Sequence, residues 1–188
     1  MSLPALMNLI FGLILWFMAK HSIADYALQL PFKFMYGKFK GRGWAKALAA
    51  HCGVHALFTL IIAWTYTGNA LTGLLLGAMD FWLHFAMDRI KASPKLLGRF
   101  KTLNAREWEV ANNMAQGLAS STGYTLPSST WKNPDERKAY IDEGKRLLRQ
   151  NMIFWLCLEL DQRVHALTDL LSAYIIIQAI VSNATLGT

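Results

Sequence analysis

The stretch that decides the fold reads Asp80-Phe-Trp-Leu-His84-Phe-Ala-Met-Asp88-Arg-Ile-Lys91 and closes an apolar run that begins near Ala70. The run is long enough for a membrane-spanning helix. Residues four apart lie on one face of a helix, so Asp80, His84 and Asp88 form a single polar row. Ionisable groups at membrane depth are costly and normally face a bundle interior, a partner or a metal ion. The stretch therefore predicts a helix that packs against others through this row.

Three other apolar segments carry histidine and aspartate at the same spacing. The pairs are His21 with Asp25, His51 with His55, and Asp161 with His165 and then Asp169. Together with His84, they account for all five histidines of the chain. We therefore predict a polar centre where four membrane helices converge.

The composition fits one membrane domain built almost entirely from helices. The chain has 188 residues, of which 54% are hydrophobic and 16% charged, as expected for several membrane helices with short polar connections. We predict an all-α integral membrane four-helix bundle with helices at about 3–30, 44–66, 70–90 and 151–181. A cytoplasmic, partly helical insert at about 91–150 lies between helices three and four. Short amphipathic helices at 105–118 and 134–149 flank a loop over 120–133.

Basic residues indicate the orientation and the partners. The net charge is +7, and lysine and arginine gather in the connectors after helices one and three, which predicts that both connectors face the cytoplasm. We expect a multi-pass protein of the bacterial inner membrane with both termini periplasmic. The first connector interleaves Lys33, Lys38, Lys40 and Arg42 with aromatic residues, a pattern that also suits single-stranded nucleic acid. Beside two membrane helices we expect lipid headgroups and no nucleic acid. A homo-oligomer, or a protein partner that binds the insert, stays open.

Imidazole and carboxylate together are ligands of first-row transition metals, and bundle helices present them inward at i and i+4. The predicted metal ligands are His21, Asp25, His51, His55, His84, Asp88, Asp161 and His165. Eight ligands exceed the needs of one tetrahedral ion, so we predict two divalent ions (zinc, manganese or iron), about 3.5–4 Å apart as in two-metal enzymes. A structural polar network and an ion or proton path are the competing interpretations.

Further polar residues near these pairs are predicted to support the site or to meet substrate. They are Gln29, Asp80, Lys91, Gln162 and Asp169. Asp80 is either a hydrogen-bonding partner of His84 or a ligand itself, and Asp169 holds the equivalent place after His165. Lys91 either extends to the membrane surface or meets an anionic substrate. No residue is assigned as catalytic.

Four motifs carry a resemblance to a known family. They are His21-Ser-Ile-Ala-Asp25-Tyr-Ala-Leu-Gln29, the histidine of the second helix, His84-Phe-Ala-Met-Asp88-Arg-Ile-Lys91 and Asp161-Gln-Arg-Val-His165. This order resembles an uncharacterised family of small bacterial and phage membrane proteins, a domain of unknown function with HxxxDxxxQ, HxxxDxxK and DQxxH motifs. Tyr26 replaces the usual Phe, and the insert is less typical of the family. The chain is also distantly similar to membrane-bound metal-dependent hydrolases, which implies metal binding and hydrolysis.

The expected function is a membrane-embedded, metal-dependent hydrolase with a cytoplasm-facing site, and a phosphorylated lipid is the expected substrate. The alternative is a non-enzymatic membrane protein, either a partner-binding or phage-interference scaffold or a cation-handling protein, that the same centre stabilises. A transporter needs polar residues that continue to the far face of the membrane. The outer halves of helices two and three carry almost none, which disfavours that interpretation.

Overall fold

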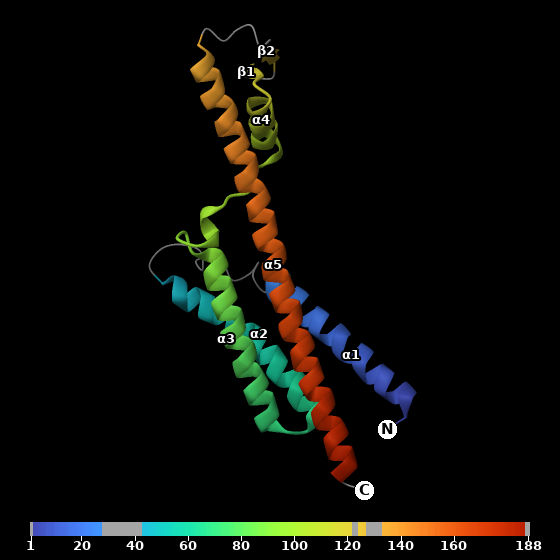
Figure 1. Ribbon diagram of the computed structural model, residues 1–188. Coiled ribbons are helices and arrows are strands. Elements are labelled where there is room, and N and C mark those ends of the chain that lie inside the picture. Colours follow the sequence, from blue (N-terminus) through green and yellow to red (C-terminus); the bar gives the residue numbers. More distant parts are fainter. Residues whose placement is uncertain (1, 28–42, 122–123, 127–132, 187–188) are drawn as a thin grey trace. The chain divides into compact units, whose positions relative to one another are not determined.

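The computed structural model describes residues 2–27, 43–121, 124–126 and 133–186. Its elements in chain order are α1 (Leu3–Ser22) with a π-helical turn (Ile23–Ala27), α2 (Trp44–Thr67), α3 (Ala70–Ala92), a 3₁₀ turn (Leu97–Arg99), α4 (Ala105–Ala115), β1 (Ala119–Ser121), β2 (Tyr124–Leu126) and α5 (Pro134–Leu186) (Figure 1). The chain divides into two compact units, one of Met1–Ser93 with Asp161–Thr188 and one of Pro94–Leu160. The candidate site lies in the first unit.

Four helical segments are long and apolar enough to cross a membrane within the part of the chain that the structure describes. They are Leu3–Asp25, Trp44–Thr67, Ala70–Arg99 and Pro134–Ala184. The prediction of an all-α chain with four such helices is therefore confirmed at this level. That these helices lie in a membrane, and which side of it their ends face, remain predictions.

The fourth helix differs from its prediction. The sequence predicts separate helices over 134–149 and 151–181, whereas α5 is one continuous helix from Pro134 to Leu186. No proline or glycine falls between residues 145 and 160, and arginine and glutamine at 149 and 150 are good helix formers, so nothing ends the first segment. The predicted start is correct, because the Asp135 backbone N–H donates to Asn133 Oδ1 at 2.9 Å as a helix cap does.

The second unit, Pro94–Leu160, corrects two further expectations. The helix predicted over 105–118 ends at Ala115, because Gly117 adopts a positive φ of 71° that glycine tolerates better than other residues. The loop predicted over 120–133 includes part of a short antiparallel pairing, in which Ala119 lies opposite Leu126. The start of α4 is fixed by Asn104 and Glu107, which form a reciprocal capping box.

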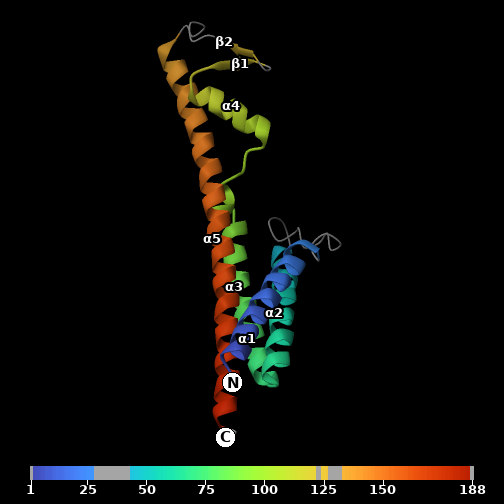
Figure 2. The same cartoon turned by 90° about the vertical axis from the view of Figure 1, so that its right-hand side faces the viewer.

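Helices α2 and α3 form a close antiparallel hairpin, which lies side by side in Figure 1 and Figure 2. The predicted turn at 67–69 is present. Gly68 has a φ of 66°, and Asn69 Oδ1 accepts hydrogen bonds from the backbone N–H groups of the next helix. A Cβ atom at Gly73 or at Gly77 would lie 2.9 Å from a backbone carbonyl oxygen of α2. The two glycines, four apart, therefore let the two backbones approach closely.

The interior of the first unit has an apolar half and a polar half. The apolar half comprises Leu13, Phe17, Ile62, Ala63, Leu76, Ala173 and Ile176. The polar half is drawn from the end of α1, the first half of α2, the second half of α3 and residues 161–169 of α5. Because α2 runs antiparallel to α3 and begins near the end of α1, these four segments meet at one level, as the sequence predicts.

Candidate metal centre

Histidines of α2 face acidic and imidazole groups of α3 across the close hairpin. His51 Nε2 lies 3.3 Å from Asp88 Oδ2. The His84 ring stacks between two other imidazoles, with 4.1 Å between its centroid and that of His55 and 4.1 Å to that of His165. Three helices thus present histidines to one another in direct contact.

Asp25 connects the C-terminal end of α1 to the histidines of α2. Its carboxylate lies 2.9 Å from His21 Nε2, 3.2 Å from His55 Nε2 and 3.4 Å from His51 Nε2. Asp25 belongs to the π-helical turn that follows α1. Such turns occur frequently at functional sites because they break the regular helical register. One carboxylate therefore meets three imidazole nitrogens from two helices.

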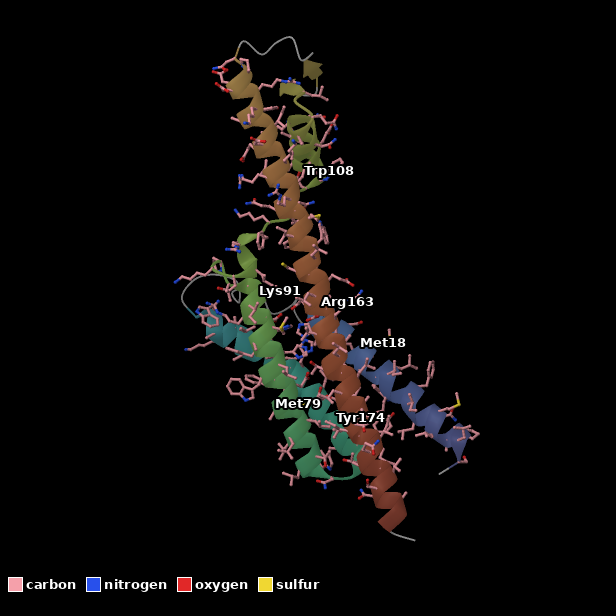
Figure 3. All side chains as sticks on the ribbon, in the orientation of Figure 1. Met18, Met79, Lys91, Trp108, Arg163 and Tyr174 are labelled. Atoms are coloured by element: carbon pink, nitrogen blue, oxygen red, sulfur yellow. The ribbon has the colours of Figure 1, made fainter. Side chains whose placement is uncertain are left out.

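Residues of α5 complete the cluster. His165 Nε2 lies 3.3 Å from Asp161 Oδ1 and 3.9 Å from Asp88 Oδ1. Lys91, labelled on α3 in Figure 3, places its Nζ 2.5 Å from Asp161 Oδ2 and 3.9 Å from Asp88 Oδ1. The lysine is thus part of the cluster and not a side chain that merely extends to the surface.

All eight predicted ligands are brought together in the structure. Among the described residues, three groups could each hold a metal ion, with a ligand atom of every member within 4.8 Å of the others. The groups are His21, His55 and His84; Asp25, His51 and His55; and Asp88, Asp161 and His165. Six of the eight side chains are buried, and His21 and Asp25 are half-buried.

The separations between ring nitrogens and carboxylate oxygens inside the cluster run from 2.9 Å to 3.9 Å. Two ligands that each lie about 2.1 Å from one tetrahedral zinc ion are separated by roughly 3.4 Å. The contacts of His51 with Asp25 and with Asp88, and of His165 with Asp161, are 3.3–3.4 Å. These contacts are compatible with neighbouring ligands of one ion.

His84 is arranged as a ligand with a supporting carboxylate. Its Nδ1 lies 2.9 Å from Asp80 Oδ1 and 3.1 Å from the Asp80 backbone oxygen. Both atoms are acceptors, so the Nδ1 position carries the proton and the lone pair of the neutral ring lies on Nε2. His84 Nε2 is buried and has no hydrogen-bond partner among the described residues. A carboxylate–histidine pair of this kind orients metal-binding imidazoles.

Sequence reasoning missed the role of Lys20. This side chain is only 1% exposed, and its Nζ donates to Asp80 Oδ2 at 3.0 Å, to Asp169 Oδ1 at 2.6 Å and to Thr59 Oγ1 at 3.1 Å. Thr59 in turn donates to Asp80 Oδ2 at 2.7 Å. Two unexplained aspartates at membrane depth were the available indication of a buried cation, because a lone carboxylate is costly there.

The remaining support residues differ from one another. The Asp80 backbone oxygen lies at hydrogen-bond distance from His84 Nδ1, 3.1 Å, and Asp80 Oδ1 lies 2.9 Å from it, which agrees with one of the two predicted options. Asp169 pairs with Lys20, with 2.6 Å between Asp169 Oδ1 and Lys20 Nζ. Gln162 Nε2 lies 3.4 Å from Asp161 Oδ2, a long contact that agrees with a supporting role. Gln29 lies outside the described residues.

Comparisons of the chain with protein-family models, with curated proteins and with solved structures find no match. The resemblance of the four motifs to a family of small membrane proteins therefore stays a prediction. The geometry of the cluster is the basis for any statement about function.

Proposed function

We propose that this chain is a membrane-embedded hydrolase that uses two divalent metal ions bound by its histidine and aspartate cluster. The observation that carries the proposal is His84, whose Nδ1 is held by Asp80 while Nε2 is buried without a partner among the described residues. Leaving a buried polar atom unsatisfied costs about 1–3 kcal/mol. A metal ion that accepts the Nε2 lone pair removes that cost.

Two of the three groups share no residue, which favours two ions over one. One consists of His21, His55 and His84, and the other of Asp88, Asp161 and His165. Three protein ligands with a remaining open position is the form that catalytic zinc sites take. His51 stands between Asp25 and the second group, since His51 Nε2 lies 3.4 Å from Asp25 and 3.3 Å from Asp88. In the proposal His51 links the two ions, and Asp25 supports the first group through its contacts with His21 and His55.

The charge of the cluster also favours cations. Its carboxylates are Asp25, Asp80, Asp88, Asp161 and Asp169, and the lysines in contact with them are Lys20 and Lys91. The carboxylates therefore outnumber these ammonium groups in a site that is largely buried. Excess buried negative charge is unfavourable unless it is paired or coordinates metal. Divalent ions supply the missing positive charge.

Bound metal ions of this kind lower the pKa of a water ligand and polarise a phosphoryl or carbonyl oxygen. The residues of this chain supply the rest of such a site. Lys91 Nζ is within 2.5 Å of Asp161 and is 28% exposed, so it can also contact an anion that arrives at the cluster. With four membrane-type helices around the site, a phosphorylated lipid of the bacterial inner membrane is the proposed substrate, reached from the cytoplasmic side.

The test is the metal content of detergent-purified protein by mass spectrometry, with the wild type compared with His84→Ala. We expect about two equivalents of a transition metal per chain in the wild type and a clear reduction in the variant. Ser172→Ala is a suitable control, because Ser172 is buried on the same helix as His165 and donates a hydrogen bond within that helix, to Thr168 O. Release of phosphate from lipid phosphates is then measured. Folded wild type that binds no metal, even after incubation with zinc, manganese or iron, contradicts the proposal.

The alternative is a non-enzymatic membrane protein. It draws support from Lys20, which already forms ion pairs with Asp80 and Asp169 without a metal. A scaffold predicts that chelation lowers the melting temperature while no lipid phosphate is hydrolysed. A conducting path is disfavoured by the apolar half of the interior, where Phe17, Ile62 and Ile176 pack beyond the polar cluster.

A further inference from the structure

A pocket lies between α1 and the part of α5 that belongs to the first unit. Its volume is about 350 Å³, at the lower end of the range for small-molecule sites. Apolar side chains form most of its wall, namely Ile14, Phe17, Met18, Leu170 and Ala173. Met18, labelled on α1 in Figure 3, is 63% exposed and Leu170 is 53% exposed. The pocket is therefore a groove that opens on the outer surface of the helices.

The groove also has polar lining residues, which are His21, Ser22, Gln162 and Asp169. His21 and Ser22 are the last lining residues of α1 and Gln162 is the first of α5, whereas Asp169 lies farther along α5 beside Leu170. His21 belongs to the same candidate metal group as His84, so the groove leads directly to the candidate metal centre. Ser22 and Gln162 add neutral donors and acceptors beside it. The groove thus joins an apolar channel to hydrogen-bonding groups and a metal-binding group.

Both walls come from segments with the length and hydropathy of membrane helices, Leu3–Asp25 and Pro134–Ala184. An opening between such helices faces hydrocarbon and not water, which excludes small polar solutes as the main occupant. A helix from a second protein would need a broad, shallow surface to pack against, and its apolar side chains would not pair with the polar residues of the groove. A single hydrocarbon chain with a polar head matches both the apolar wall and the polar lining residues of the groove.

We infer that the groove binds one acyl chain of a bilayer glycerophospholipid and places the ester and phosphate region of that lipid at His21. This inference deepens the proposed function and rests on it for the head end only. Once two divalent ions occupy the cluster, its excess of carboxylates is offset, and an anionic phosphate is electrostatically complementary to it. The apolar wall requires no metal.

The experiment uses phosphatidic acid with a photoreactive diazirine on one acyl chain, mixed into lipid nanodiscs that contain the full chain. After irradiation, cross-linked peptides are mapped by mass spectrometry. We expect labelling concentrated on residues 14–22 and 162–173. Ala166→Trp fills the groove from its exposed rim, because Ala166 lines the pocket and is itself exposed, and it should reduce this labelling by about tenfold.

Leu167→Trp is the matched control. Leu167 is the next residue of α5, is 64% exposed and does not line the groove, so labelling of the groove should be unchanged. Equal labelling in wild type and Ala166→Trp, or labelling spread evenly over the outer faces, overturns the inference and identifies the lipid as general bilayer lipid. Equal loss in both tryptophan variants overturns it as well.

Metal content is measured on the same samples, so failures of the two proposals are separable. Groove labelling in a metal-free protein retains the acyl-chain site and rejects the metal-dependent hydrolase. Two metal ions without groove labelling retain the metal centre and reject the acyl-chain site.

Discussion

The two halves of the first unit's interior are built on different principles. In the apolar half, side chains such as Phe17 and Ile176 are almost completely buried and contribute through removal of surface from water or lipid and through packing. In the polar half, burial is equally complete for His55 and Asp80, but there each buried polar atom that lacks a partner costs free energy. One bundle can therefore contain an apolar half that tolerates changes of side chain and a polar half in which each charged or polar group is stabilised by specific neighbours.

The largest effect on stability is expected at Lys20. Lys20→Met removes the cation between Asp80 and Asp169 and leaves buried carboxylates without it, which should lower the free energy of unfolding by about 3–5 kcal/mol. Denaturant titration in detergent, followed by helical circular dichroism, measures this change. Lys46→Met, at an exposed lysine of α2, should alter stability by less than about 0.5 kcal/mol. Equal effects of both variants would mean that the Lys20 network contributes nothing.

A cavity in the apolar half should affect stability alone. Ile176 is fully buried, and Ile176→Ala should cost about 2–5 kcal/mol through lost packing. Because Ile176 lies outside the metal groups, the number of metal ions bound per folded chain should equal that of wild type. Mass spectrometry of the folded fraction checks this. A loss of metal in Ile176→Ala would show that packing in the apolar half and metal binding in the polar half are coupled.

The smallest effect is expected at the support of His84. Asp80→Asn keeps the shape of the side chain but weakens the acceptor that holds His84 Nδ1, 2.9 Å away. Loss of such a partner typically lowers metal affinity by about 10–100-fold. Titration with a competing chelator should therefore show weaker binding, while the stoichiometry at saturating metal stays at the wild-type value. Unchanged affinity would show that Asp80 serves only Lys20 and Thr59.

The four membrane-type helices and the residues that form the candidate site can be predicted from the sequence, because both depend on the spacing of apolar and polar residues along a helix. Apolar runs predict the four membrane-type helices, and the four-residue spacing predicts that His51 and His55, or His84 and Asp88, share a face. Equal depth in antiparallel helices then brings these faces together. To predict which residues lie at the same depth, one needs only to count how many residues separate each of them from the end of its helix.

Other features depend on information that periodicity does not contain. A lysine near the end of an apolar helix, such as Lys20, commonly extends toward the membrane surface, and spacing cannot distinguish that arrangement from an inward one. The partner of Asp169 depends on helix rotation, which is set by packing. The continuity of α5 depends on the absence of any residue that ends a helix near 150, whereas the change from charged to apolar composition suggests a boundary.

Lys20 has a consequence for biogenesis. Its three partners, Thr59, Asp80 and Asp169, belong to α2, α3 and α5, which are synthesised after α1. In a membrane, α1 therefore carries an unpaired ammonium group during most of translation, and Asp80 meets its cation only when two helices associate laterally. The last acceptor, Asp169, arrives with the final helix. The charge pairing of Lys20 is consequently complete only once α5 has been synthesised past Asp169, and a chain truncated before α5 leaves Lys20 without that acceptor.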